Sequence, residues 1–257
     1  MIDNRFAVFL DIDGTLISDS FRIPPPNLEA IAAARAKGHM VFINTGRSWG
    51  NIPDELREQF NVDGVIAGSG SMIIMNGETV FQRKFDDETV RKTAEYFFNH
   101  RDCWCVFEGL KTNYIIPNAG YVVRDGRQTE LKSIDDLSLF VEGEEIQVIA
   151  AGPVVPDEFM GMLSDKMTFF IMRTYADCVI KGCDKAKGIE RVLEITGIKK
   201  ENTIAIGDSS NDLAMLEYAG ISVAMGNSQE HILQMADYVT DTAANSGVAK
   251  AIKKYLL

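Results

Sequence analysis

The sequence lacks any long apolar run. The run near the N-terminus covers only residues 6–10 and ends at Asp11. A membrane-spanning helix needs about 20 apolar residues, and a signal peptide has an apolar core of at least about seven. We therefore expect a cytoplasmic protein that has no membrane partner.

Histidine and cysteine are scarce as well. The 257 residues include three histidines and four cysteines, and the histidines lie far apart in the chain. Cys103 and Cys105 are separated by one residue, whereas a zinc knuckle has two residues between its cysteines. In a reducing cytoplasm the thiols stay free. We expect four thiols in the core and no zinc site.

Positively charged residues are in the minority. The sequence has 26 Lys and Arg residues and 37 Asp and Glu residues, which gives a net charge of −11. An acidic surface repels nucleic-acid phosphates, so the charge predicts no nucleic-acid partner. A small anionic substrate would need a local cation to overcome the same field. The composition leaves the oligomeric state open.

Two separated parts of the chain show short apolar runs that alternate with helical patterns. The runs cover residues 6–10, 40–43, 65–67, 203–206 and 221–224. Buried strands separated by helices indicate a parallel sheet that is covered on both faces. We predict an α/β fold with a Rossmann-like parallel-sheet core.

The middle of the chain has a different pattern. From about residue 85 to residue 180 the apolar runs are longer and alternate with polar residues, with two helical stretches between them. This pattern is typical of an α+β domain. We predict a catalytic core formed by residues 1–83 and 184–257, with an inserted α+β cap domain formed by residues 84–183.

Polar residues follow the predicted core strands where each strand ends. Asp11 and Asp13 follow the first strand, and Asp208 and Asp212 follow a late one. In an open parallel sheet the ligand crevice lies beyond the carboxyl ends of the strands. Four clustered acids repel one another unless a cation lies among them, and oxygen ligands alone favour Mg²⁺. A turn and a helix start would explain each pair of acids separately, but they explain the repeated pattern poorly.

Two lysines, Lys185 and Lys187, open a predicted helix. The helix dipole disfavours cations at this end, so an anion bound beside Lys187 would remove the conflict. A solvated pair with Asp184 as the helix cap is the alternative. The hydroxyl and amide groups of Thr45 and Gly46 follow the second strand and can hold phosphate oxygens. Together with the acids, these groups predict a phosphoryl-transfer site.

Four ordered motifs resemble those of the haloacid dehalogenase (HAD) superfamily. They are DIDGTL at residues 11–16, TGR at 45–47, KG at 187–188 and GDSSND at 207–212. The insert resembles the type IIB cap of the Cof-like phosphatases in this superfamily. The resemblance covers essentially the whole chain. It implies a HAD-like core and a cap that closes over the site and reads the leaving group.

The resemblance also implies a role for each motif residue. Asp11 would be the nucleophile that carries the phosphoryl group, and Asp13 would be the general acid and base. The Mg²⁺ site would comprise Asp11, Asp13 (through its backbone carbonyl), Asp208 and Asp212. The phosphate would bind to the Ile12 amide and to Thr45, Gly46, Lys187 and Asn211. Candidate substrate contacts are Arg47, Ser69 and Arg173, although many relatives have Asn-Gly where this chain has Ser69-Gly70.

The predicted function is therefore an Mg²⁺-dependent phosphatase that acts on a small phosphomonoester, such as a sugar phosphate. A phosphomutase of the same superfamily is the alternative enzyme. A non-catalytic regulator that binds a phosphorylated metabolite is the alternative of another class, but it would not need both Asp11 and Asp13. Glu108, Asn113 and Tyr175 are polar residues of the insert that could face the site, although an ordinary solvated surface is the simpler explanation for each.

Overall fold

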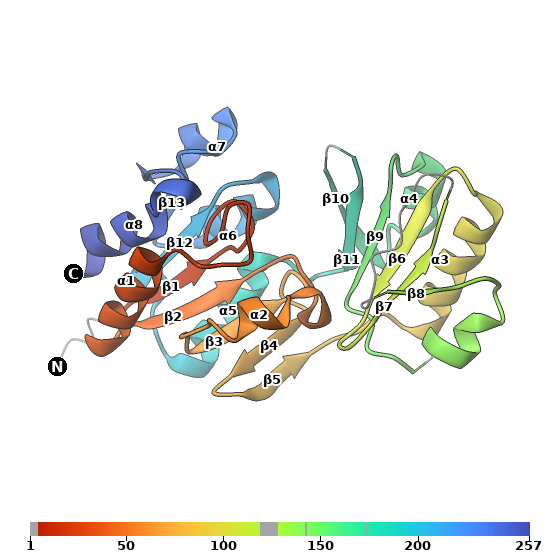
Figure 1. Cartoon of the computed structure of the whole chain (residues 1–257), viewed down its shortest axis with the longest axis horizontal. Coiled ribbons are helices and arrows are strands. Elements are labelled where there is room, and N and C mark those ends of the chain that lie inside the picture. The colour runs from red at the N-terminus through yellow and green to blue at the C-terminus, as the bar shows by residue number, and fades with distance from the viewer. Residues whose placement is uncertain (1–4, 119–127, 142, 173) are drawn as a thin grey trace. The chain divides into compact units, whose positions relative to one another are not determined.

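A computed structural model describes residues 5–118, 128–141, 143–172 and 174–257. The chain separates into two compact units (Figure 1). Residues 5–46, 53–81 and 184–257 form the first unit. The second unit combines residues 47–52 with the described part of 82–183. No helix among the described residues has the length and apolar character needed to cross a membrane.

The first unit contains an eight-stranded sheet in the order β14-β13-β12-β1-β2-β3-β4-β5. Its strands are β1 (Ala7–Leu10), β2 (Met40–Asn44), β3 (Gly64–Ala67), β4 (Met72–Met75), β5 (Glu78–Gln82), β12 (Thr203–Gly207), β13 (Ile221–Ala224) and β14 (Tyr238–Val239). Neighbouring strands from β14 to β3 are parallel, and β4 pairs with β3 in the antiparallel direction. The predicted α/β fold with a parallel-sheet core is confirmed.

The described part of the first unit also contains six α-helices. They are α1 (Pro25–Ala36), α2 (Asp54–Arg57), α5 (Lys185–Thr196), α6 (Leu213–Tyr218), α7 (Glu230–Met235) and α8 (Gly247–Leu256). Helix α1 packs beside α8, and α5 packs beside α6 (Figure 1). Every residue of β1 and β12 is buried, so these two strands lie at the centre of the core.

The second unit contains a six-stranded sheet in the order β10-β11-β9-β6-β7-β8. Its strands are β6 (Trp104–Glu108), β7 (Asn113–Ile116), β8 (Gln128–Glu130), β9 (Val148–Gly152), β10 (Met167–Ile171) and β11 (Ala176–Ile180). All neighbours are antiparallel except β7 and β8. Its helices are α3 (Asp87–Asn99), α4 (Asp157–Met162) and a helical turn at Leu137–Val141. The helices and one sheet face share a core that includes Phe97, Phe107 and Phe159.

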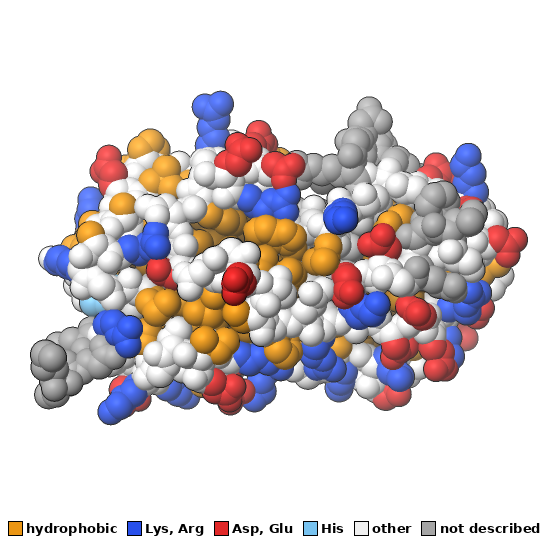
Figure 2. Space-filling model, turned by 90° about the horizontal axis from the view of Figure 1, so that it is seen from below, with side chains coloured by type: hydrophobic (Ala, Val, Ile, Leu, Met, Phe, Trp, Pro, Cys, Tyr) orange, Lys and Arg blue, Asp and Glu red, His pale blue; other side chains and the backbone are white. Residues whose placement is uncertain are grey.

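Charged side chains of both signs are interspersed on the face drawn in Figure 2, as far as its described residues show. The net charge of −11 is therefore not gathered into a single acidic patch on that face. Among the described residues, a group of three acids close enough together to hold a metal ion lies inside the first unit. It lies at the sheet edge where the parallel strands β1, β2, β3 and β12 end.

Candidate active site

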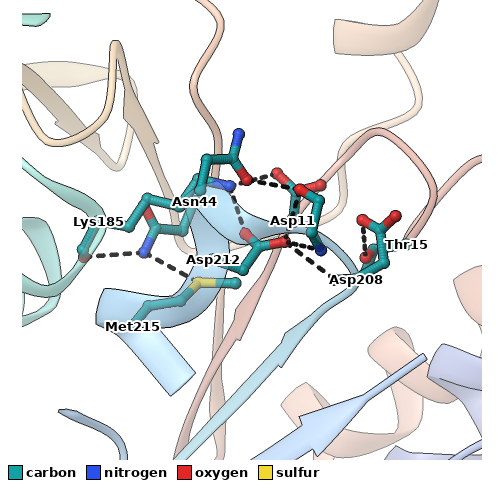
Figure 3. A network of polar contacts seen from close by, with 9 residues as sticks. Asp11, Thr15, Asn44, Lys185, Asp208, Asp212 and Met215 are labelled. Carbon is teal, nitrogen blue, oxygen red and sulfur yellow. Dashed lines mark hydrogen bonds and ion pairs between the residues drawn. The ribbon is translucent and has the colours of Figure 1, made fainter. Parts of the chain in front are cut away.

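The site is assembled by the register of two neighbouring strands. Leu10 at the end of β1 lies opposite Ile206 in β12, and the Asp11 amide donates a hydrogen bond of 3.1 Å to the Ile206 carbonyl. Asp11 and Asp208 follow these strands directly, so both carboxylates reach the same edge of the sheet (Figure 3).

Three carboxylates lie together at this edge. Oxygen atoms of Asp11, Asp208 and Asp212 all lie within 4.8 Å of one another. Burial raises the pKa of Asp11 well above its ordinary value; Lys185 opposes this shift and Asp212 adds to it. Burial likewise raises the pKa of Asp208 to about 7, with Asp212 adding to the shift. The fold therefore confines negative charge that water solvates poorly.

The donor set fits a hard divalent cation. The clustered ligand atoms are carboxylate oxygens, which Mg²⁺ prefers. Three carboxylates and one ammonium group give −3 + 1 = −2 when all are ionised. A divalent ion would balance this charge and keep the acids ionised.

Lys185 supplies the positive charge of the cluster. Its Nζ atom lies 2.6 Å from Asp11 Oδ1 and 2.5 Å from Asp212 Oδ1 (Figure 3). The lysine side chain is only 1% exposed. Burial by itself lowers the pKa of Lys185, but the two carboxylates outweigh burial and raise it. The lysine is therefore a buried cation held between two acids.

Lys187 lies elsewhere. Its side chain is 52% exposed, and its Nζ atom lies 2.6 Å from Glu190 Oε2 on the outside of α5. Two residues along a helix correspond to a rotation of about 200°, so Lys185 and Lys187 point to opposite sides. The structure thus brings Lys185 to the carboxylates, whereas Lys187, the lysine predicted to bind phosphate, pairs with Glu190.

The first turn of α5 is fixed from three sides. Asp184 caps the helix, because its carboxylate accepts a 2.7 Å hydrogen bond from the Lys187 amide. Asn44 at the end of β2 is fully buried, and its Nδ2 atom donates to the Lys185 carbonyl at 3.0 Å. Gly188 packs so closely that an added Cβ would lie 2.5 Å from Ile66 Cγ2. These contacts aim the Lys185 side chain at the sheet edge.

Asp212 links the lysine to the loop that carries Asp208. One oxygen of Asp212 is bound to Lys185, and the other accepts hydrogen bonds from the amides of Asp208 (2.9 Å) and Ser209 (3.1 Å). Thr15 donates to Asp208 Oδ1 at 3.2 Å. Asp212 therefore orients Lys185 and Asp208, in addition to adding its own charge.

Asp13 lies outside the close triplet of carboxylates. It is exposed, whereas Asp11 and Ile12 before it are buried. The charge of Asp13 nevertheless raises the pKa values of both Asp11 and Asp208, so it lies near them. An acid beside the cluster but open to solvent can exchange protons with a substrate and with water.

Two other predicted phosphate contacts, Thr45 and Asn211, and one predicted substrate contact, Ser69, lie around Gly46. The Ser69 amide donates to the Thr45 carbonyl at 3.0 Å. A Cβ atom added to Gly46 would lie 3.4 Å from Asn211 Nδ2 and 3.6 Å from Ser69 Oγ. Thr45, Gly46, Ser69 and Asn211 are therefore neighbours within the first unit. Arg47 belongs to the second unit, and Arg173 lies outside the described residues.

Helical periodicity could have identified Lys185 from the sequence. Ile189, Val192 and Leu193 are the apolar residues that mark the buried face of α5. Lys185 precedes Ile189 by four residues, which places it on that face, whereas Lys187 does not share this spacing. Asn44 and Thr15 were also missed. The signal for Asn44 is an amide side chain that ends a buried apolar strand.

Comparisons with known proteins agree with this geometry. The chain matches the haloacid dehalogenase-like hydrolase family over residues 8–252. It is 31% identical to 5-amino-6-(5-phospho-D-ribitylamino)uracil phosphatase YcsE of Bacillus subtilis, covering 97% of this chain and 95% of the relative. It is 25% identical to phosphoglycolate phosphatase 1 of Saccharolobus solfataricus, covering 97% and 95% of the two chains.

A solved structure of the HAD subclass IIB sugar phosphatase BT4131 superposes with a TM-score of 0.79 at 30% identity, covering 97% of this chain and 98% of that one. This chain belongs to the haloacid dehalogenase-like hydrolase family. The family predicted from the four motifs is therefore confirmed. The matches also support the prediction that the chain is an enzyme, of the phosphoric monoester hydrolase class.

The position of Lys185 generates a prediction about stability. Lys185→Met should lower the free energy of unfolding at neutral pH by about 3–5 kcal/mol, because it leaves buried carboxylates without their cation. Lys187→Met is the matched control on the same helix and should leave the urea midpoint near that of the wild type. Adding Asp212→Asn to Lys185→Met should restore part of the loss. Equal midpoints for the two lysine variants would contradict the assignment.

Proposed function

We propose that this protein is an Mg²⁺-dependent phosphatase that hydrolyses a small phosphomonoester through an aspartyl-phosphate on Asp11. The observation that carries the proposal is the buried Asp11 carboxylate, which Lys185 holds at 2.6 Å within the cluster that includes Asp208 and Asp212. A carboxylate in this setting has a fixed direction and a neighbouring cation, as a nucleophile of phosphoryl transfer requires.

In the first half of the proposed reaction, an Asp11 oxygen forms a bond to phosphorus while the bond to the leaving oxygen breaks. Asp13 gives its proton to that leaving oxygen. In the second half, Asp13 takes a proton from water, and the water oxygen attacks phosphorus and displaces Asp11. The exposed position of Asp13 suits both transfers, since the leaving group and the water must reach it in turn.

We assign the stabilisation of phosphoryl charge to groups around Asp11. Lys185 takes the role expected of Lys187, because its ammonium group already contacts the nucleophile. Thr45, Gly46, Asn211 and the Ile12 amide complete the phosphate site in this proposal, since they follow β1, β2 and β12 at the same edge. Preorganised donors of this kind lower the barrier because they need no rearrangement as charge develops.

Asp11, Asp208 and Asp212 would hold the Mg²⁺ ion, together with the backbone carbonyl of Asp13. When bound, the ion neutralises charge on the carboxylates and on the phosphoryl oxygens. Asp212 contributes chiefly by orientation in this proposal, because Lys185 and two amides already occupy its oxygens.

For the substrate we propose a sugar phosphate or a similar small metabolite, read by the inserted unit. The similar proteins support this class, because one is a sugar phosphatase and another acts on a phosphorylated ribityl compound. The phosphoglycolate phosphatase among them has a smaller substrate, so the fold serves leaving groups of different size.

The nucleophile assignment predicts the behaviour of one variant. Asp11→Asn should reduce turnover of p-nitrophenyl phosphate by more than about a thousandfold, because the amide is not a nucleophile at phosphorus. The amide retains an oxygen for Lys185, so the fold should survive. The control is Asp19→Asn, an exposed acid on the following loop. Comparable activity in the two variants would remove Asp11 from the chemistry.

The role of Asp13 predicts a kinetic signature. The p-nitrophenolate leaving group needs no proton, so Asp13→Asn should still form the phosphoenzyme but hydrolyse it slowly. We expect a burst of p-nitrophenolate that matches the enzyme concentration, followed by a slow steady rate, measured by stopped-flow absorbance. A variant with the wild-type steady rate and no burst would contradict the acid and base role.

The metal assignment predicts that a chelator stops turnover and that added Mg²⁺ restores it. Asp208→Asn should raise the Mg²⁺ concentration that gives half-maximal activity by at least about tenfold, because it removes one charged ligand. Ser210→Ala alters an exposed residue of the same loop and should behave like the wild type. Full activity in the presence of excess chelator would exclude the metal.

A further inference from the structure

The segment Arg47–Ile52 belongs to the second unit, although its chain neighbours on both sides belong to the first. The chain therefore passes between the units at four places, two more than a simple insertion requires. Thr45 and Gly46 stay with the catalytic sheet, and the next residue, Arg47, does not. The contacts of this segment show what holds it in the second unit.

Glu108 at the end of β6 binds the segment through both of its carboxylate oxygens. The Ser48 amide donates to Oε2 at 3.3 Å, and Asn51 Nδ2 donates to Oε1 at 2.9 Å. Packing supports these bonds, because an added Cβ on Gly50 would lie 2.4 Å from the Gly109 carbonyl oxygen. The segment thus lies directly against the chain that follows β6.

Glu108 is the centre of a row of three polar residues on adjacent strands. Asn113 of β7 lies opposite Glu108 in the sheet. The backbone amide of Gln147, just before β9, donates to the backbone carbonyl of Glu108 at 3.0 Å. Both neighbours also hold the segment. Gln147 Oε1 accepts from the Trp49 amide at 3.2 Å, and Asn113 Nδ2 donates to Asn51 Oδ1 at 3.3 Å.

This polar row is energetically expensive. Glu108, Asn113 and Gln147 are 7%, 5% and 0% exposed. Asn113 Oδ1 and Gln147 Nε2 find no hydrogen-bond partner among the described residues. Burying a charge and unpaired amide groups costs stability, and such costs are usually retained for function.

The row also binds Arg47 indirectly. Arg47 Nη1 donates to the Asn51 carbonyl at 3.1 Å, so the guanidinium group folds back onto the residue that Glu108 holds. Burial raises the pKa of Glu108, whereas the hydrogen bond from Ser48 and the charge of Arg47 oppose the rise. The carboxylate and the guanidinium group are therefore electrostatically coupled within one unit.

We infer that Glu108 is a positioning residue that anchors residues 47–52 to the second unit, so that Arg47 contacts the leaving group of the substrate and not the transferred phosphate. The inference rests on the proposed function for the identity of the reaction. A guanidinium group presents several donors in a fixed plane, which suits a leaving group with hydroxyl or anionic oxygens. The phosphate contacts remain with Thr45 and Gly46 in the first unit.

The anchoring itself can be tested without activity. Glu108→Gln removes the charge and one acceptor, so amide hydrogen exchange in residues 47–52 should become at least about tenfold faster. Exchange in β1 should not change. The matched control is Glu145→Gln, a carboxylate of the second unit that is 40% exposed and pairs with Lys84. Asn51→Ala removes the contact from the segment side and should give the same acceleration. Unchanged exchange in both anchor variants would overturn the inference.

The effect on the substrate needs a kinetic comparison. With the hexose phosphate that the wild type hydrolyses fastest, Glu108→Gln and Arg47→Ala should each raise KM about tenfold, and the double variant should raise it no further. Inhibition by inorganic phosphate should change by less than about twofold, because phosphate occupies only the first unit's site.

Two results would overturn the role in substrate reading: additive effects in the double variant, or an equal loss of affinity for inorganic phosphate. A wild-type protein that hydrolyses no phosphomonoester would refute the proposed function. The exchange measurement would then still decide whether Glu108 anchors the segment.

Discussion

The contact of one buried lysine with two buried aspartates is the interaction on which the site depends. Lys185 lies within 2.6 Å of Asp11 and 2.5 Å of Asp212, and all three residues are shielded from water. Burial disfavours an ionised carboxylate, and a nearby ammonium group offsets part of that cost. The rest of the site follows from this contact, because Asp212 then orients the Asp208 loop through backbone amides. The strands β1 and β12 must be neighbours for the contact to form.

The sequence predicts the sheet edge and its acids well, because both depend on local patterns. An apolar run that ends in Asp11 or in Gly207-Asp208 marks a buried strand and the first polar residue beyond it. The order of the strands was not visible in the sequence. It determines that Asp11 lies beside Asp208, and it depends on contacts between residues almost 200 positions apart.

The choice between the two lysines shows where motif matching is weaker than helical geometry. The motif pointed to Lys187, but Lys185 has the spacing of the buried face of α5. The contact of Asn44 with the Lys185 carbonyl was beyond sequence reasoning, because it joins β2 to a helix 141 residues later. For the same reason, the sequence did not show that residues 47–52 belong to the second unit. Their partners Glu108 and Gln147 are distant in the chain and were not expected to face them.

The shared polar row of the second unit has a consequence for evolution by recombination. One fold can serve different functions when the residues that contact the ligand change and the scaffold is kept. Here the inserted part includes a short piece that is encoded separately, between β2 and α2. If recombination moved only the contiguous insert into a related protein, Glu108 would move with it but residues 47–52 would not. The buried Glu108 carboxylate would then lose its hydrogen bonds to Ser48 and Asn51. In this chain, replacement of the inserted unit is therefore tied to a matching change in residues 47–52.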